Sequence, residues 1–219
     1  MKKFKVVLIA AAILFGTHVS AQNSPLTFGV RAGVNLSSIT GDETDDVNPI
    51  VGFNAGVTMD WEFAPSMFLM TGLNFTTKGA RMEESGTEAG VSWTETLTAR
   101  PMYLQLPVHF GYKFEVAPGT RLVLHAGPYV AFGIGGKYRF EATENGHTES
   151  ESIDIWGHGY DDMEEPNRFD FGVGVGVGLE LPNRMTIGLG FDMGLANIWD
   201  DNDFSQRNMN AHLTVGFRF

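Results

Sequence analysis

The chain has 219 residues, no cysteine and a formal net charge of −11. The acidic excess excludes a nucleic-acid-binding function, because phosphate backbones require a basic surface. The lack of cysteine excludes a disulfide framework and a lipid anchor on an amino-terminal cysteine. The length fits one domain.

The amino terminus has the pattern of a secretory signal peptide. Lys2, Lys3 and Lys5 precede an apolar run over residues 6–15, and small residues end at Ala21, where cleavage is expected. We therefore predict a cleaved signal peptide over residues 1–21 and a mature domain over residues 22–219. Cleavage removes three of the 15 basic residues and leaves 12 against 26 acidic ones, so the formal charge becomes −14. The apolar run is shorter than the roughly 20 residues that a membrane-spanning helix needs.

Eight segments alternate apolar and polar residues with the period of two that β-strands have. In the fourth segment, Leu104, Leu106 and Val108 share one face, whereas Gln105 and His109 share the other. Each segment reaches the roughly 9 to 11 residues with which a tilted strand crosses a membrane. The eight predicted strands cover residues 27–38, 50–63, 66–79, 100–115, 120–140, 168–181, 184–197 and 208–219.

The links between these strands alternate in length. Three are tight and contain the Pro, Gly and Asn that turns require, at residues 64–65, 117–119 and 182–183, and the other four are long. An even strand number with short periplasmic turns and long outer loops is typical of outer-membrane barrels. We therefore predict an all-β fold, an eight-stranded, antiparallel, up-and-down transmembrane β-barrel in the outer membrane, with periplasmic termini and extracellular long loops.

A soluble barrel of the lipocalin type, with its apolar face inside, is the alternative. Two patterns favour a lipid-facing apolar surface. Glycine crowds the polar faces of the sixth and seventh strands, which suits a narrow lumen. Aromatic residues on the apolar faces gather near the strand ends, as interfacial girdles do. The outer girdle is predicted to contain Phe53, Phe75, Phe132, Tyr138 and Phe169, and outer-membrane lipids are the expected surroundings.

Four motifs carry a family resemblance. They are Phe28-Gly-Val-Arg-Ala-Gly-Val-Asn-Leu-Ser37, Tyr103-Leu-Gln-Leu-Pro-Val-His-Phe-Gly-Tyr-Lys-Phe114, His125-Ala-Gly-Pro-Tyr-Val130 and Phe169-Asp-Phe-Gly-Val-Gly-Val-Gly176. Together they resemble the small outer-membrane β-barrel family of Bacteroidetes, often labelled PorT-like or porin family, over essentially the whole mature chain. The resemblance implies the fold and the location, and one relative is associated with a protein-secretion system.

The last strand ends on an aromatic residue at the carboxyl terminus. Leu213, Val215, Phe217 and Phe219 share one face of it. A closing strand must pair with the first strand so that no edge stays free. We predict that Phe217 and Phe219 form the assembly signal that the barrel-assembly machinery recognises.

Charged residues of both signs lie on the polar faces and are expected in the lumen. Glu115 and Arg121 flank one tight turn, and Glu180 and Arg184 flank another. Each pair is therefore expected to meet across its hairpin. Lys137 and Arg139 are also expected to point inward. Because eight strands leave little open bore, we predict a salt-bridged plug in preference to a conducting pore. The predicted lumen charge network contains Arg31, Asp60, Glu62, Lys113, Glu115, Arg121, Glu180 and Arg184.

The long links hold 20 of the 26 acidic residues. A solvated rim is the plain interpretation, and loose divalent-cation binding or capture of a basic partner is the functional one. The weak metal candidates are Asp154, Asp161, Asp162, Glu164 and Glu165.

Catalytic chemistry has little support in the sequence. His147 and His158 in the third long link stand near Ser150, Ser152 and acidic residues, but no nucleophile motif or zinc spacing occurs. No cofactor is expected. We predict a non-enzymatic outer-membrane protein with a structural or surface-interaction role through its acidic loops. A narrow channel and a secretion-system accessory are the alternatives.

Overall fold

The computed structural model describes residues 25–88, 91–157, 165–199 and 205–219, and these residues form ten β-strands. The predicted signal peptide lies outside the described residues. No helix in the described ranges is long and apolar enough to cross a membrane. The strands are β1 (Leu26–Gly41), β2 (Val47–Ala64), β3 (Met67–Thr77), β4 (Ala80–Glu88), β5 (Val91–Ala117), β6 (Thr120–Glu144), β7 (His147–Asp154), β8 (Phe169–Glu180), β9 (Met185–Gly194) and β10 (Gln206–Arg218).

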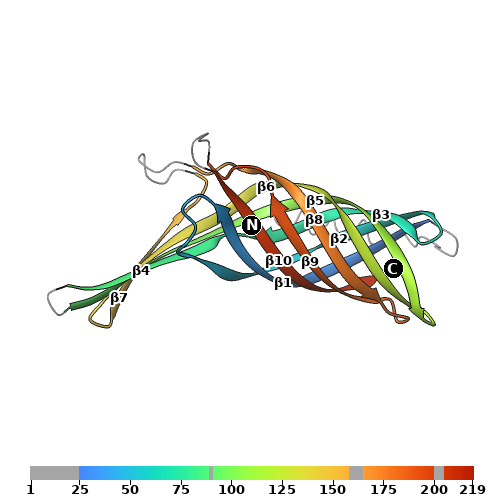
Figure 1. The fold of residues 1–219 in the computed structure, drawn as a ribbon, viewed down its shortest axis with the longest axis horizontal. Helices are drawn as coiled ribbons and strands as arrows, with labels where there is room; N and C mark the ends of the chain where they lie inside the picture. Colours follow the sequence, from blue (N-terminus) through green and yellow to red (C-terminus); the bar gives the residue numbers. More distant parts are fainter. Residues whose placement is uncertain (1–24, 89–90, 158–164, 200–204) are drawn as a thin grey trace, which may run out of the picture.

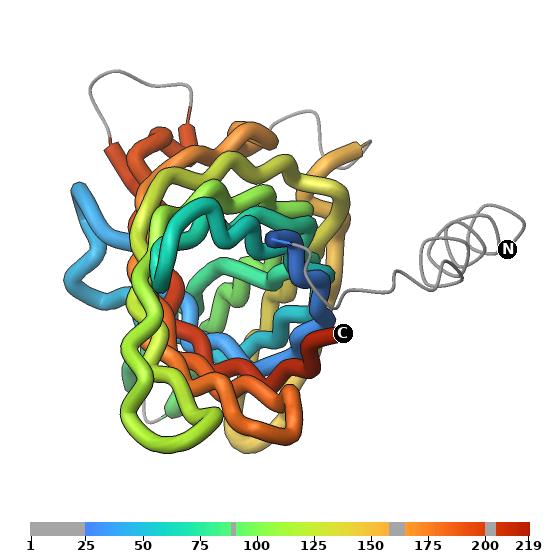
Figure 2. The backbone as a smooth tube through the Cα atoms, turned by 90° about the vertical axis from the view of Figure 1, so that its right-hand side faces the viewer, coloured from blue at the N-terminus to red at the C-terminus, as the bar shows by residue number. Residues whose placement is uncertain are grey.

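Eight of these strands close into a ring, which confirms the predicted fold class. The antiparallel pairs run β1–β2–β3–β5–β6–β8–β9–β10, and β10 pairs with β1 from Gly29 opposite Arg218 to Gly41 opposite Gln206. Figure 1 shows the tilted strands from the side, and Figure 2 shows the closed ring along its length. Closure leaves the ring without a free edge.

Three tight turns and the last residue lie at one end of the ring, which we call the turn end. The turns fall where the sequence predicted them, at Pro65–Ser66, at Pro118–Gly119 and between Glu180 and Met185. The backbone NH of Phe219 donates to the Phe28 carbonyl at 2.8 Å, so the chain closes on its first strand there. The opposite end is called the extension end.

Strands β4 and β7 stand outside the ring and correct the prediction of two long loops there. β4 pairs with β5 from Ala80 opposite Ala99 to Glu88 opposite Val91, and β7 pairs with the last part of β6. Together with residues 91–101 of β5 and 136–144 of β6 they form a twisted sheet that projects from the ring (Figure 1), which we call the extension. Its sequence alternates β-branched and charged residues, and backbone hydrogen bonding between neighbours makes these segments strands.

The apolar faces of the ring strands point outward, as predicted. Val34 is 54 % exposed and Leu189 is 58 % exposed, whereas Lys113 on a polar face is 1 % exposed. A water-soluble barrel would show the reverse. The described part of the ring therefore has an apolar outer surface and a polar interior.

A bulge in β6 corrects the predicted direction of several side chains. Met102 of β5 pairs with Gly135, but Tyr103 pairs with Gly133, so β6 holds one extra residue. Because side chains alternate with a period of two, one extra residue exchanges the faces of everything beyond it. Tyr138 therefore points inward and not into the outer girdle, while Lys137 and Arg139 are exposed on the outside and not in the lumen.

Candidate functional site

The lumen at the turn end is organised around the ammonium group of Lys113. Its Nζ lies 2.8 Å from Glu62 Oε1, 3.0 Å from Glu180 Oε1 and 3.2 Å from Asp60 Oδ2. The same Nζ stands 4.5 Å above the ring of Phe68, which is 1 % exposed. One buried cation on β5 therefore pairs with three carboxylates from two other strands, β2 and β8, and it also packs on an aromatic ring.

Two arginines complete this cluster. Arg121 contacts Glu180 at 2.7 Å and Glu62 at 3.4 Å, and Arg218 of the last strand also pairs with Glu180. The structure therefore brings together five of the eight residues predicted for the lumen network: Asp60, Glu62, Lys113, Arg121 and Glu180.

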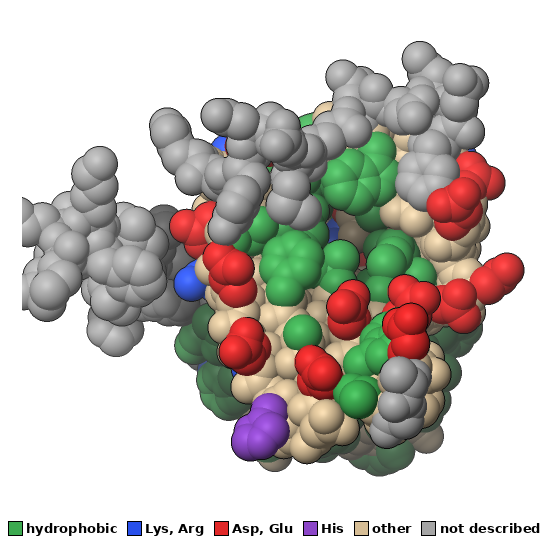
Figure 3. Space-filling model, turned by 90° about the vertical axis from the view of Figure 1, so that its left-hand side faces the viewer, with side chains coloured by type: hydrophobic (Ala, Val, Ile, Leu, Met, Phe, Trp, Pro, Cys, Tyr) green, Lys and Arg blue, Asp and Glu red, His purple; other side chains and the backbone are tan. Residues whose placement is uncertain are grey.

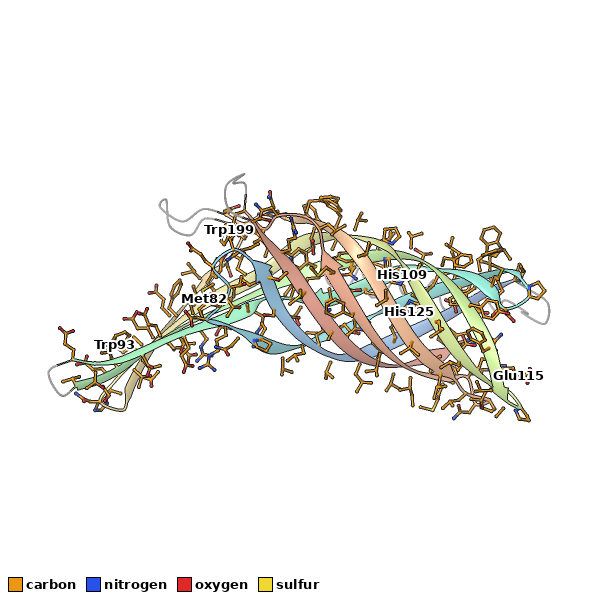
Figure 4. The ribbon with its side chains drawn as sticks, in the orientation of Figure 1. Met82, Trp93, His109, Glu115, His125 and Trp199 are labelled. Carbon is orange, nitrogen blue, oxygen red and sulfur yellow. The ribbon has the colours of Figure 1, made fainter. Side chains whose placement is uncertain are left out.

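The other predicted members lie apart from this cluster. Arg31 Nε donates to Asn74 Oδ1 at 3.0 Å, further along the lumen. Glu115 is exposed at the turn end (Figure 4). Arg184 is exposed in the turn between β8 and β9, and in the described chain neither residue forms an ion pair. The expected hairpin pairs are therefore wrong, because Arg121 and Glu180 point into the lumen and meet each other.

Polar side chains fill the middle of the lumen and leave little space. Nδ1 of His109 and Nδ1 of His125 are 2.8 Å apart, and both rings lie inside the barrel (Figure 4). Gln105 donates to Asp192 at 3.0 Å. The remaining cavity in this layer has a volume of about 20 Å³, which holds about one water molecule.

A second buried ion pair closes the lumen towards the extension end. Lys78 is 0 % exposed, and its Nζ donates to Asp170 Oδ2 at 2.7 Å. The ammonium also lies 4.5 Å from the ring centre of Tyr129 and 5.3 Å from that of Tyr103. Trp156 packs against Tyr103 at 5.7 Å, and its Nε1 donates to the Pro166 carbonyl at 2.8 Å. The ion pair and the aromatic rings around it form a layer that covers the polar lumen, and we call this layer the lid.

The sequence analysis did not identify Lys78 or Phe68 as lumen residues. Along β3 and the residues that follow it, both alternate in step with Asn74 and Thr76, which are buried on the lumen side. The alternation in the sequence therefore indicated that they face the lumen. The apolar character of Phe68 hid it, because lumen residues were expected to be polar.

The candidate metal and catalytic residues do not form a site in the described ranges. Asp161, Asp162, Glu164 and His158 lie outside the described residues, and Glu165 accepts the Gly157 backbone NH at 3.1 Å. The described residues contain no group of three potential metal ligands, so cation binding at Asp154 and Glu165 stays a prediction. His147 and the pair Ser150 and Ser152 lie on opposite faces of β7, which separates the proposed acid-base and nucleophilic groups.

Comparison with solved structures gives barrels of similar size and low sequence identity. Ail of Yersinia pestis is 16 % identical, with 88 % of this chain and 98 % of that chain covered and a TM-score of 0.35. Neisserial surface protein A is 13 % identical, with 88 % and 97 % covered and a TM-score of 0.41. The outer membrane enzyme PagL is 14 % identical, with 86 % and 98 % covered and a TM-score of 0.45.

None of the curated proteins matches this sequence. The family model described as "Outer membrane protein beta-barrel domain" matches residues 20–200, which is most of the chain. The apolar outer surface, the ring closed by β1 and β10 and the polar lumen are what membrane insertion of such a domain requires. The chain therefore belongs to the outer membrane protein beta-barrel domain family.

Proposed function

We propose that this protein is a closed, non-enzymatic barrel of the outer membrane that holds the extension outside the cell for interaction with a partner. The proposal rests on the difference between the filled ring and the solvated extension. The ring is filled by two buried ion clusters centred on Lys113 and Lys78, whereas the extension carries exposed carboxylates beyond the ring. A rigid barrel with a projecting, solvated surface is suited to recognition.

The proposed orientation is testable with single cysteines, since the chain has none of its own. Glu144 is exposed at the far end of β6 in the extension, and Glu115 is exposed at the turn end. A membrane-impermeant maleimide should label Glu144→Cys on intact cells and Glu115→Cys only after the outer membrane is permeabilised. Labelling in the opposite order would overturn the orientation and with it the surface-interaction role.

A narrow channel is the second candidate, and the filled lumen argues against it. The turn-end cavity has a volume of about 90 Å³ and the middle one about 20 Å³, with Phe68, Lys113 and Trp156 among the buried side chains. An eight-stranded ring has room only for the side chains that fill it. In planar bilayers we expect no unit conductance steps, and reproducible steps at neutral pH would favour the channel.

A further inference from the structure

A large, mainly apolar cavity opens at the extension end, above the lid formed by Lys78, Asp170 and Trp156. Its volume is about 640 Å³, which lies within the range of pockets that bury ligands. Tyr103 and Asn208 line it nearest the lumen. Apolar side chains make up most of the remaining wall: Ile39, Met82, Leu97, Tyr138, Ile155, Ile198 and Trp199.

The bulge in β6 places Tyr138 in the wall of this cavity. Without the extra residue, Tyr138 would face outward and Lys137 inward. The Tyr138 phenol lies in the extension, and burial raises its pKa to about 12, so it stays a protonated, uncharged donor at neutral pH. Among the described residues that line the cavity, Glu43 is therefore the one charged side chain.

An acidic trough continues directly from the cavity along the extension. The two hollows share Glu43, Met82 and Leu97 in their walls, and the trough has a volume of about 1180 Å³. Its wall contains no Lys, Arg or His among the described residues. Figure 3 shows apolar side chains in a central hollow with carboxylates around it. The carboxylate residues of the trough are Glu43, Asp46, Glu83, Glu84, Glu95, Glu141, Glu149 and Glu151.

Strand alternation explains why the two surfaces are continuous. Met82 and Glu84 follow one another on the same face of β4, and their cross-strand partners Leu97 and Glu95 lie on the same face of β5. Nearest the ring this face is apolar, and farther out it is acidic (Figure 4 shows Met82 at the base of the extension and Trp93 near its tip). Glu84 and Glu95 stand directly opposite each other. Their like charges repel, which destabilises this part of the sheet when no partner is bound.

We infer that this surface binds a basic peptide segment of a protein partner, with one bulky apolar side chain in the cavity and its lysine or arginine side chains along the trough. Fatty acids, polyanions and nucleic acids are disfavoured, because the carboxylates repel them. A small cation would leave most of the combined hollow unfilled, whereas an extended peptide reaches both parts. The inference rests on the proposed function, since the partner must reach the extension from outside the cell.

The test uses the full mature protein folded in phosphatidylcholine nanodiscs, whose lipid carries no net charge. The probe is a capped synthetic peptide, Lys-Lys-Trp-Lys-Lys, and binding is measured by isothermal titration calorimetry. One analogue has Ser in place of Trp, and another has Glu in place of every Lys. We expect the Ser analogue to bind at least about tenfold more weakly, as loss of a buried aromatic anchor predicts. The Glu analogue should give no heat of binding.

Protein variants separate the two halves of the surface. Glu84→Gln, Glu95→Gln and Glu149→Gln combined should weaken binding at least about tenfold and reduce its dependence on salt. The matched control removes three carboxylates outside both hollows, Glu88→Gln, Glu115→Gln and Asp154→Asn, and should bind as the parent does. Ala99→Phe should fill the cavity, and Met82→Ser should make its wall polar. Each should abolish the preference for Trp over Ser while the salt dependence remains.

Every outcome decides the inference. Equal binding of the Trp and Ser peptides, or equal weakening by the two triple variants, would show nonspecific attraction to an acidic rim and overturn it. Heat-modifiable gel migration identifies any variant that has not folded, and Met82→Ser serves if Ala99→Phe does not fold. If peptides do not bind but Glu144→Cys is labelled on cells, the inference fails and the proposed function stands. If they bind but labelling places the extension in the periplasm, the binding surface stands and the proposed function fails.

Discussion

At Lys113 a single ammonium group faces three carboxylates inside a ring whose outer surface is apolar. The contacts to Asp60, Glu62 and Glu180 join strands β2, β5 and β8, so the group ties distant parts of the ring together. Such an arrangement adds little net stability over an apolar core, but its partners depend on it once they are buried.

Lys113→Met is therefore expected to destabilise the barrel by roughly 3 to 5 kcal/mol, because Asp60 loses its ion pair and Glu62 and Glu180 keep only their arginine partners. Urea unfolding in detergent, followed by gel migration, measures the change. Acidification should restore part of the loss by protonating the carboxylates. Lys137→Met, at an exposed residue outside the ring, is the control and should change stability by less than about 0.5 kcal/mol. Equal stability of the Lys113 variant and the control would contradict the role of the cluster.

Gly111 provides a second test at the scale of one residue. A methyl group there would overlap the ring of Phe68 and press on the Leu124 carbonyl, so Phe68 occupies space that only glycine leaves free. Gly111→Ala should cost about 1 to 3 kcal/mol, the usual range for overpacking. Gly135→Ala meets no atom within 4 Å and should be nearly neutral. Relief of the Gly111→Ala loss by Phe68→Leu would identify the ring as the cause, and no relief would argue against it.

At the scale of elements, the β6 bulge determines which side chains the extension presents to its cavity. Its position between Gly133 and Gly135 exchanges the two faces of the strand beyond it. The extension is continuous with the ring through β5 and β6, which run for 27 and 25 residues. It therefore belongs to the same sheet, and its faces follow from the register of the ring.

Deleting Gly135 should return β6 to an unbroken register and reverse the exposure of its outer part. In the parent, Arg139→Cys should react faster with a water-soluble maleimide than Tyr138→Cys, which lines the cavity. In the deletion background the order should invert. Glu115→Cys is exposed at the turn end, away from the bulge, and should react at the same rate in both backgrounds. An unchanged order after the deletion would show that the bulge does not set the faces.

Two outward aromatic residues lie at and just after the end of β10, and their role in assembly remains a prediction. Phe217 is 41 % exposed and Phe219 is 50 % exposed, with ring centres 5.7 Å apart. Phe219→Asp should leave the protein in the periplasm, since a charged terminus on the lipid side hinders recognition and insertion. Val116→Asp, which places a charge on an exposed apolar residue near the turn end, is the control. Fractionation measures both, and normal outer-membrane levels of Phe219→Asp would contradict the signal.

At the scale of the whole molecule, the apolar belt and the filled lumen make the ring a membrane-dependent fold. Exposed valine, leucine, isoleucine and phenylalanine side chains cover the outer faces of all eight ring strands. A soluble monomer rarely exposes apolar surface on this scale. The refolded mature chain should therefore show β-rich circular dichroism and heat-modifiable migration in detergent, and it should precipitate without detergent. A stable, detergent-free monomer would contradict membrane insertion.

The sequence by itself determined the strand number of the ring, the three tight turns and the direction of its faces. Alternation with a period of two is a local property, so residues such as Leu104 and Gln105 reveal their opposite environments without knowledge of their neighbours. Turn residues are equally local, because Pro118 fixes its own φ and Gly119 can adopt the positive φ of 70° found in this turn.

Only the tertiary structure decided which charges meet and where the alternation breaks. Arg121 lies opposite Glu115 in the hairpin register, as expected, but its ion pair is with Glu180 on the other neighbouring strand, β8, since both of these side chains point into the lumen. Tyr138 and Lys137 exchange faces because of one extra residue whose place depends on pairing with β5. The strands β4 and β7 exist because neighbouring segments supply their hydrogen bonds. Pairing between strands is a nonlocal property, and for this reason the sequence pattern along a single strand could not supply it.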